Sequence, residues 1–598
     1  MGSDGAFNAA SQSRAGGATP SATRGFAVPL VVAVTGHRDL LPAEVPSIRA
    51  RVREFLASLR DASPGRIVAV MSALAEGADR IVAEEAIALG LPLHVPLPMP
   101  RELYVADFAT PESRAEFDAM CAAAAEVYEL PLLPGHTPAS IAEQGIERAR
   151  QYAQAGVFLC AHCHVLLALW DGKPSEQLGG TAQVVRFHHH DVMPGYTSAA
   201  TAGRLTLADD ESDLVYHIVC SRDRPDGAPA AGLRPMSAAW FTADPSEPRS
   251  GEMPARHRQV FERANEFSTD AQARAAEIAA QSWPLYSAAA AARLPSGLRD
   301  INQVFCAADY LAIHFQKRVL AVLGVTHACA FVTGLAYVSY ADLSASRALL
   351  LLALAPMVVA YLISLVANRG AWHRKYLDYR TLAEGLRVQF YWAAAGVRSG
   401  SVSKFAHDNF LQAQDPDLGW IRNVMRVAGT ECDARPLPST AGLEFAIREW
   451  IGDERAGQLG YYRRKIDERV SRQSTTRGVM RLSLWATAIS FAALLAVGDW
   501  IPDGVQNPVT YLLGCILLLV GVRQSYAKST AESELIKQYE FMHRIFRNAH
   551  ARLAEAQTDD ERRRLLKILG DAALEEHAEW ILMHRERAID QKEAVRLG

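Results

Sequence analysis

The sequence predicts two parts: an α/β domain built on a doubly wound parallel sheet, followed by an all-α membrane domain with four transmembrane helices. The first half alternates short apolar runs with amphipathic helical stretches, a pattern typical of a parallel sheet with helices on both faces. The second half contains four long apolar runs without Lys, Arg, Asp or Glu. Uncharged runs of this length are typical of membrane-spanning helices.

Five apolar runs in the first half have the length of buried strands. They cover residues 30–34, 66–71, 92–98, 164–170 and 214–219. Helical periodicity follows the first two, at residues 45–59 and 80–89. Because parallel strands need crossover connections, this alternation predicts a parallel sheet with helices on its faces.

The loops that follow these strands have residue types suited to phosphate. In open α/β sheets, ligands bind beyond the carboxyl ends of the strands. Glycines let backbone amides approach an anion, His37 and Arg38 can donate to it, and helices starting after Gly77 and Gly180 direct partial positive charge toward it. The alternative is that the glycines only form tight turns.

The candidate ligand-binding residues lie at the ends of the first, second and fourth expected strands and in the loops that follow. They are Thr35, Gly36, His37, Arg38, Ser72, Glu76, Gly77, Ala78, Asp79, Asp171, Gly172, Gly179, Gly180 and Thr181. Among them, Asp79 is expected to cap a helix or to hold a ribose hydroxyl. Tyr104, Asp107 and Phe108, after the third strand, either cover a base or belong to the core.

These motifs resemble those of the SLOG domains, Rossmann-like relatives of the LOG and DprA proteins. The resemblance rests on residues 35–39, 72–80, 169–172 and 179–185 and covers about residues 30–222. It implies a nucleotide-binding domain. Some members hydrolyse nucleotide N-glycosidic bonds, whereas others sense NAD-derived or second-messenger nucleotides and are fused to effectors in bacterial defence systems. The implied partner is an ADP-ribose-like or cyclic nucleotide, with no separate cofactor.

One departure from the LOG pattern argues against catalysis. LOG hydrolases carry a GGxGTxxE motif with a catalytic Glu, and the matching position here is Val184. Valine cannot act as a general acid or base, so we expect no catalytic residue there. Glu76 and Asp79 remain as carboxylates near the crevice, which keeps a membrane-tethered nucleotide N-glycoside hydrolase as the alternative.

The four long apolar runs cover residues 319–340, 348–367, 482–497 and 505–522. A helix needs roughly 20 residues to cross the hydrocarbon core, which the first two satisfy. The last two are shorter, and Pro508 lies near the start of the fourth, so a partly interfacial or re-entrant hairpin is the alternative. Short turns join the runs into two hairpins.

Basic residues predict the orientation of the first hairpin; they are Lys317, Arg318, Arg369, Arg374, Lys375 and Arg380. The turn of the second hairpin carries Asp499 and Asp503 but no Lys or Arg. By the positive-inside rule, both turns face outward and both termini are cytoplasmic. With the resemblance to bacterial proteins, this places the chain in the inner membrane as a multi-pass protein.

Residues 300–590 resemble the SLATT membrane effector domains, which are associated with SLOG sensors and are thought to form pores or disrupt the membrane. The expected function is a membrane effector gated by a nucleotide-derived ligand in an antiphage or stress response. Because four helices cannot enclose a selective channel alone, a pore requires a homo-oligomer in contact with lipid. His327, in the first span, either lines the pore or bonds a neighbouring helix.

The expected organisation has seven segments. They are a disordered tail (1–27), the nucleotide-binding domain (28–230), a helical linker (231–318), the first hairpin (319–367), a cytoplasmic helical segment (368–480), the second hairpin (481–522) and C-terminal helices (523–598). Ala383-Glu384 and Ala531-Glu532 each follow a hairpin, so the two halves of the membrane domain are predicted to be diverged copies of one unit.

Composition excludes two further kinds of site. The formal net charge of −4 gives no general attraction to nucleic acid. Cys160 and Cys163 have metal-ligand spacing, but no second such pair follows, so we predict no metal there. His188, His189 and His190 are predicted to lie in a solvated loop.

Overall fold

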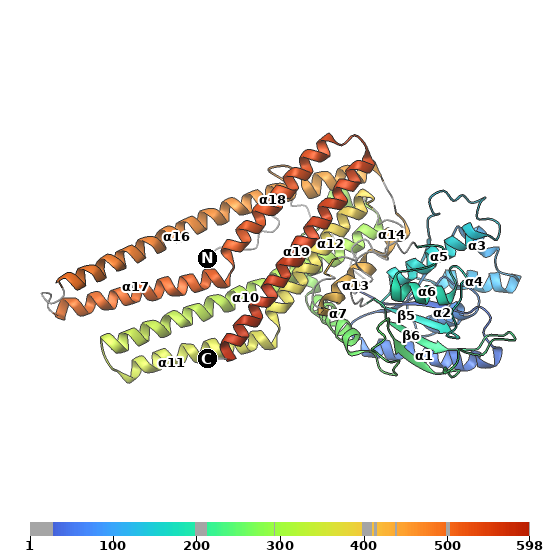
Figure 1. Ribbon diagram of the computed structural model, residues 1–598, viewed down its shortest axis with the longest axis horizontal. Coiled ribbons are helices and arrows are strands. Elements are labelled where there is room, and N and C mark those ends of the chain that lie inside the picture. Colours follow the sequence, from blue (N-terminus) through green and yellow to red (C-terminus); the bar gives the residue numbers. More distant parts are fainter. Residues whose placement is uncertain are drawn as a thin grey trace. The chain divides into compact units, whose positions relative to one another are not determined.

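The computed structural model describes residues 28–197, 212–291, 294–397, 410–411, 416–436, 439–497 and 503–596. The expected tail, residues 1–27, lies outside them. The chain forms two compact units, each described by itself below (Figure 1). One comprises Leu311–Arg380 and Ala446–Leu565 and contains the apolar hairpins. The other contains the α/β domain with Thr381–Phe445 and residues 566–596.

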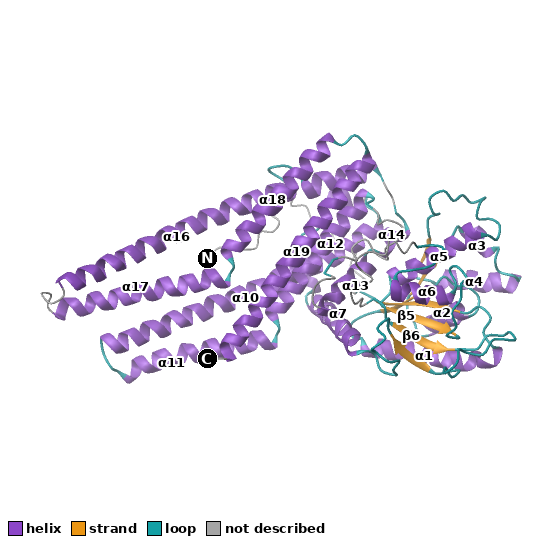
Figure 2. Cartoon of the chain, viewed as in Figure 1, coloured by secondary structure: helices purple, strands orange, loops and turns teal. Residues whose placement is uncertain are grey.

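A mostly parallel seven-stranded sheet confirms the predicted α/β class (Figure 2). The strand order is β4-β3-β2-β1-β5-β6-β7, and β7 alone pairs antiparallel. The strands are β1 (Leu30–Gly36), β2 (Val68–Met71), β3 (Leu93–Leu97), β4 (Glu126–Glu129), β5 (Val165–Trp170), β6 (Val215–Val219) and β7 (Ala238–Phe241). The prediction missed β4 and β7, and β7 lies within the segment expected to be a helical linker.

The helices that accompany the sheet are α1 (Val45–Ala62), α2 (Ala78–Ala88), α3 (Arg101–Val105), α4 (Pro111–Ala123), α5 (Ile146–Ala161), α6 (Thr181–His190) and α7 (Ala255–Ala273). The predicted solvated loop at His188–His190 is wrong, because these residues form the last turn of α6. His188 is fully buried, with Nε2 at 3.2 Å from the carbonyl of Leu214. Asp191 then ends α6 in a left-handed conformation.

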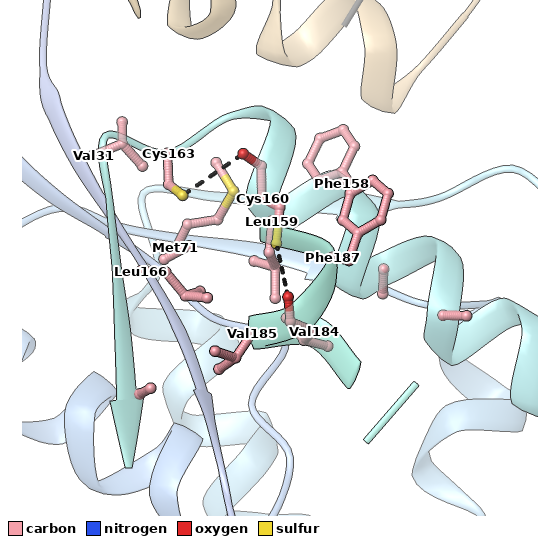
Figure 3. Packing of buried hydrophobic residues seen from close by; sticks show 14 of the residues in the cluster. Val31, Met71, Phe158, Leu159, Cys160, Cys163, Leu166, Val184, Val185 and Phe187 are labelled. Atoms are coloured by element: carbon pink, nitrogen blue, oxygen red, sulfur yellow. Dashed lines mark hydrogen bonds between the residues drawn. The ribbon is translucent and has the colours of Figure 1, made fainter. Parts of the chain in front are cut away.

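The core beside β1 and β5 contains the cysteine pair singled out in the sequence (Figure 3). The thiol of Cys160 donates to the carbonyl of Val184 at 3.7 Å, and that of Cys163 to the carbonyl of Cys160 at 3.8 Å. Val184 is 3% exposed. A Cβ on Gly156 would approach its Cγ2 to 2.7 Å. Val184 therefore occupies a tightly packed apolar core position in this domain.

The rest of this unit is helical. It comprises α8 (Ala275–Gln281), α9 (Ala288–Ala291), α13 (Gly419–Ala428), α14 (Thr430–Ala434), α15 (Thr440–Ala446) and parts of α10 (Ser296–Asp342), α12 (Trp372–Ala395) and α19 (Asp559–Arg596). The last three helices begin in one unit and end in the other without interruption.

Helix α19 packs closely against α12 at Gly570. The indole Nε1 of Trp392 donates to the carbonyl of Leu566 at 2.9 Å, and the ammonium of Lys567 lies 4.4 Å from the indole centroid. A Cβ on Gly570 would fall 2.4 Å from three atoms of the same ring. Since Trp392 is 2% exposed, the ring has no room to move aside.

We expect Gly570→Ala to destabilise this unit by about 1–3 kcal/mol, because the added methyl group forces α19 away from Trp392. Thermal unfolding of the full-length protein in detergent measures the effect. Gly478→Ala is the control, since a Cβ there meets no atom within 4 Å. That helical change should stabilise by up to about 1 kcal/mol. Equal effects of the two substitutions would contradict the assigned packing.

Within the described residues, four helices are long and apolar enough to cross a membrane. These are α10, α11 (Arg347–Arg369), α16 (Gly457–Val497) and α17 (Asp503–Ser529), which contain the four predicted runs. Large apolar side chains of these helices are exposed, including Leu351, Leu354, Leu482 and Leu495. Such surfaces are expected to face lipid, as in a membrane protein.

Polar contacts join the spans within this unit. The hydroxyl of Thr333 donates to the carbonyl of Ala353 at 3.0 Å, which links α10 to α11. The hydroxyls of Ser339 and Tyr511 lie 2.9 Å apart and link α10 to α17. The His327 ring meets the Tyr526 ring edge-on at 5.4 Å, so this histidine packs on a neighbouring helix.

The breaks that follow the two hairpins, and the helices after them, are related by an offset of 160 residue numbers. α12 and α18 (Glu532–Glu555) each have 24 residues. Each follows a two-residue break whose second residue is a left-handed alanine, Ala371 (φ 49°) or Ala531 (φ 51°). The break therefore ends α17 at Ser529, and α18 begins at Glu532. The predicted pairing of Ala383 with Ala531 is out of register, since Ala371 is the equivalent residue.

The backbone hydrogen bonds at the two breaks match one for one. The amide of Gly370 donates to Val366 at 3.0 Å, and that of Thr530 to Tyr526 at 3.0 Å. The next amide, of Ala371 or Ala531, donates to the residue three positions earlier at 3.1 or 3.2 Å. Shared local geometry at one offset supports the prediction of two diverged copies.

Candidate functional site

The loops after β1 and β2 are locked together at the carboxyl ends of their strands. The amide of Ala78 donates to the carbonyl of His37 at 3.1 Å. A Cβ on Gly77 would lie 2.4 Å from the carbonyl oxygen of Arg38, and one on Gly36 would lie 2.3 Å from the Cβ of Ala78. Both glycines are therefore required by close approach of the two loops and do more than permit turns.

His37 ties these loops to the one after β5. Its Nε2 accepts from the amide of Asp171 at 3.1 Å and lies 3.1 Å from Oδ1 of the same residue. Burial lowers the pKa of His37, while the Asp171 carboxylate opposes this shift. We expected His37 to donate to a ligand, but its Nε2 is directed to Asp171. Its main contribution is to hold the three loops together.

Arg38 extends from these loops into solvent. Its guanidinium lies 5.6 Å from the centroid of the Tyr152 ring on α5. Gly179, with φ +74°, reaches the same part of α5, where a Cβ would fall 2.9 Å from the amide nitrogen of Ala153. Arg38 and the Gly179 loop are thus both placed against α5, and the charge of the exposed Arg38 can attract an anion.

Residues that sequence reasoning missed support this arrangement from α5. The hydroxyl of Tyr152 donates to the carboxylate of Asp107, and Nη2 of Arg148 lies 2.7 Å from that carboxylate. Arg148 is 2% exposed and also donates to the carbonyls of Ile141 and Leu103. Arg148 and Tyr152 are four residues apart on one helix face, a spacing that the sequence did contain.

Asp79 lies in the first turn of α2 beneath Arg38. It is 7% exposed, and Oδ2 accepts from the amide of Ala75 at 3.4 Å. Burial raises the pKa of Asp79 to about 7, while the charges of Arg38 and Arg80 oppose the shift. Ser72 lies below it, fully buried, with Oγ 3.3 Å from the carbonyl of Asp79. The carboxyl is therefore half-protonated near neutral pH.

The remaining candidate residues lie near the loops after β1, β2 and β5. Thr35 is buried at the end of β1, and Thr181 opens α6 after Gly180. Gly172 is held against Leu233, where a Cβ would lie 2.3 Å from Cδ1. Tyr104 and Phe108 are at most 1% exposed and stack edge-on at 5.1 Å, so they belong to the core and cannot cover a base.

Glu76 points to the other side of α2. Its carboxylate accepts from the hydroxyl of Ser113, and it lines an open cavity of about 630 Å³ between α2 and α4. Of the predicted residues, only Glu76 and Gly77 line this cavity. Two Arg–Glu ion pairs contribute to its wall, Arg49 with Glu84 and Arg80 with Glu116 at 2.7 Å. We therefore place the candidate site at the loops and not in this cavity.

Among the described residues, no group of three or more His, Cys, Asp or Glu side chains is arranged to hold a metal ion. No protein-family model matches the chain, and the search of curated proteins found no significantly similar sequence.

Proposed function

We propose that this protein is a membrane effector controlled by a nucleotide-derived ligand, which binds where the loops after β1, β2 and β5 meet. The single observation that carries the proposal is their convergence around an exposed Arg38 at the point where the strand order reverses. The start of α2 at this point adds partial positive charge. Such a site favours the phosphates of a nucleotide.

The motif resemblance to SLOG and SLATT proteins supports the same proposal and implies an ADP-ribose-like or cyclic nucleotide. The apolar hairpins supply the effector part, and their proposed action is to permeabilise a bacterial inner membrane in an antiphage or stress response. A homo-oligomer would form the pore. A ligand can drive this change only by binding the active arrangement more tightly, and each tenfold preference contributes about 1.4 kcal/mol.

The test combines binding with leakage. The full-length protein in detergent is titrated calorimetrically with ADP-ribose, its cyclic isomers and cyclic oligonucleotides, and each ligand is analysed afterwards. Dye release from liposomes that contain the protein is then measured with the same compounds. We expect one class to bind, to be recovered intact and to release dye. Binding without release across the panel would contradict the effector role.

Arg38→Gln should weaken binding at least about tenfold, because an ion-assisted hydrogen bond contributes roughly 1.5–3 kcal/mol. Arg51→Gln is the matched control, since Arg51 is an exposed arginine on α1 that pairs with Glu54 at 3.2 Å. Unchanged ligand affinity in Arg38→Gln would contradict the placement of the binding site at the loops after β1, β2 and β5. Equal losses in both variants would point to a general charge effect.

One observation favours the second candidate, a membrane-tethered nucleotide N-glycoside hydrolase. A buried carboxyl with a pKa of about 7, such as Asp79, is suited to general acid or base catalysis near neutral pH. The core position of Val184 argues against the LOG mechanism. Release of free base from NAD or a nucleoside monophosphate, lost in Asp79→Asn, would establish the hydrolase in place of the sensor.

A further inference from the structure

Residues 425–435 lie between the α/β domain and the helices that flank the first hairpin in sequence. We call them the junction segment; they comprise the last turn of α13, Gly429, α14 and Arg435. The segment belongs to the same compact unit as the sheet and the first turns of α10. Its residues make contacts on two sides, one with the α/β domain and one with α10 and α12.

One side contacts the α/β domain at the end of α5 and at β4. His162, from the cysteine–histidine motif, donates from Nδ1 to the carbonyl of Arg426 at 2.8 Å. Its Nε2 lies 3.4 Å from Oδ2 of Asp433, and Thr430 Oγ1 lies 3.4 Å from Nδ1. His162 is 2% exposed. This buried histidine therefore connects the α/β domain to the junction segment.

Arg435 adds the contact to the edge strand. Its Nη2 donates to the carbonyl of Val127 at 2.8 Å, and its guanidinium lies 5.4 Å from the centroid of the Tyr128 ring. Both partners belong to β4, the strand at the sheet edge. The α/β domain thus holds the segment at both ends of α14.

The other side contacts α10 and α12. The hydroxyl of Ser296 donates to the carboxylate of Glu431, and a Cβ on Gly297 would fall 2.8 Å from Sγ of Cys432. On α12, Nε2 of Gln389 donates to the carbonyl of Met425 at 2.9 Å. α10 continues into the first span, and α12 follows the second.

We propose that the junction segment is the coupling element of this protein, which transmits a change in the α/β domain to the helices on both sides of the first hairpin. Thr430 and Asp433 are three residues apart and meet His162, while Glu431 and Cys432 meet the start of α10. Because α14 is short and is contacted on two faces, we expect it to move as a rigid body. A displacement of its contacts on one face therefore also displaces its contacts on the other face. His162 and Gly297 are positioning residues, because they hold the junction segment against the α/β domain and against α10, respectively.

Cys432 provides a direct measurement because it faces α10, whereas His162 lies on the opposite side. The full-length protein is alkylated in detergent with a thiol reagent, and modification of each cysteine is followed by mass spectrometry. We expect His162→Ala to raise the rate at Cys432 at least about tenfold, although His162 contacts Thr430 and Asp433 whereas Cys432 lies against α10. His190→Ala, at the exposed end of α6, is the matched control and should leave the rate unchanged.

Cys160 and Cys163 serve as internal standards because both thiols are buried in the core of the α/β domain. A rise at Cys432 alone supports the proposal. An unchanged rate at Cys432 overturns it. A parallel rise at all three cysteines also overturns it, because His162 would then hold the α/β core itself. Thr430→Val removes the hydroxyl that lies 3.4 Å from Nδ1 of His162 and changes no charge beside Cys432, so it repeats the test with less risk to folding.

Coupling must also act in the reverse direction. Gly297→Ala pushes on Cys432 from α10, and we expect faster amide hydrogen exchange in β4 and at the end of α5. Control by a nucleotide rests on the proposed function and is tested separately, by adding the ligand to the alkylation experiment. If His162→Ala raises the alkylation rate at Cys432 but added ligand does not change it, the coupling role of the junction segment is supported and control by a nucleotide is contradicted.

Discussion

Replacing Asp79 with asparagine is expected to stabilise the α/β domain by up to about 4 kcal/mol at pH 8. Burial raises the pKa of Asp79 from 3.8 to about 7, so the folded state binds this proton more tightly than the unfolded state does. Each unit of pKa shift corresponds to roughly 1.4 kcal/mol. Asparagine removes the cost of a buried charge and keeps a similar shape.

The sign of this effect fixes its pH dependence. The stability contributed by the protonated carboxyl is fully present below pH 4 and is lost as pH rises from about 4 to about 7. The difference between Asp79→Asn and the original protein should therefore be small at pH 4.5 and largest above pH 7. Thermal unfolding in detergent over this range measures it. Asp61→Asn, at an exposed carboxylate, is the control. A difference that does not vary with pH would contradict the assignment.

Gly77→Ala is expected to destabilise the same domain by more than about 3 kcal/mol and to abolish ligand binding. Gly77 has φ +83°, and an added Cβ would lie 2.4 Å from the carbonyl oxygen of Arg38 and 2.7 Å from that of His37. Both obstacles are backbone atoms, which cannot rotate away as a side chain would. The loops after β1 and β2 must separate to admit the methyl group.

Gly90→Ala is the control that distinguishes the effect of a steric clash from the effect of backbone strain. Gly90 has φ +70°, but a Cβ there meets no atom within 4 Å. Its substitution should cost only the left-handed conformation of an alanine, roughly 1 kcal/mol, and should leave ligand affinity unchanged. Denaturant unfolding monitored by tryptophan fluorescence, with calorimetry on the same samples, compares the two variants. Similar losses in both would mean that the two loops are not locked together at Gly77.

The elements predicted most accurately from the sequence are those whose location depends on hydrophobicity alone. The five central apolar strands and the four candidate spans were all located, because burial in a sheet or in lipid requires uninterrupted apolar residues. β4 and β7, at the two edges of the sheet, were missed: β4 reads Glu-Val-Tyr-Glu, and β7 reads Ala-Ala-Trp-Phe within a segment expected to be helical. Edge strands of this kind need neither length nor apolarity on both faces, so periodicity does not reveal them.

The candidate site was predicted in its backbone and only partly in its side chains. The glycines at 36, 77 and 179 were found because close approach of loops demands that residue type. His37 was predicted as a donor, but the structure directs its Nε2 to Asp171. Tyr104 was left between site and core, since an aromatic residue after a strand suits both. The supporting role of Arg148 depends on a tertiary contact to Asp107 that no local pattern contains.

The sequence predicted an internal repeat, and the backbone at the two breaks supports this prediction in a different register. Equivalent positions share few residue types, since lipid-facing helices accept any apolar side chain and charged faces accept many polar ones. The backbone at Ala371 and Ala531 retained the common geometry, including the left-handed alanine. The local resemblance between Ala383-Glu384 and Ala531-Glu532 was therefore coincidental.

The presence of both hairpins in one chain also sets the ratio of α/β domains to membrane elements. The described residues of each chain contain one α/β domain and four candidate spans in two hairpins, so any assembly of n chains would contain 2n hairpins for n α/β domains. The hairpins are joined covalently, and their ratio to the α/β domains cannot vary with expression level. The two hairpins can differ from each other in sequence while every chain contributes both.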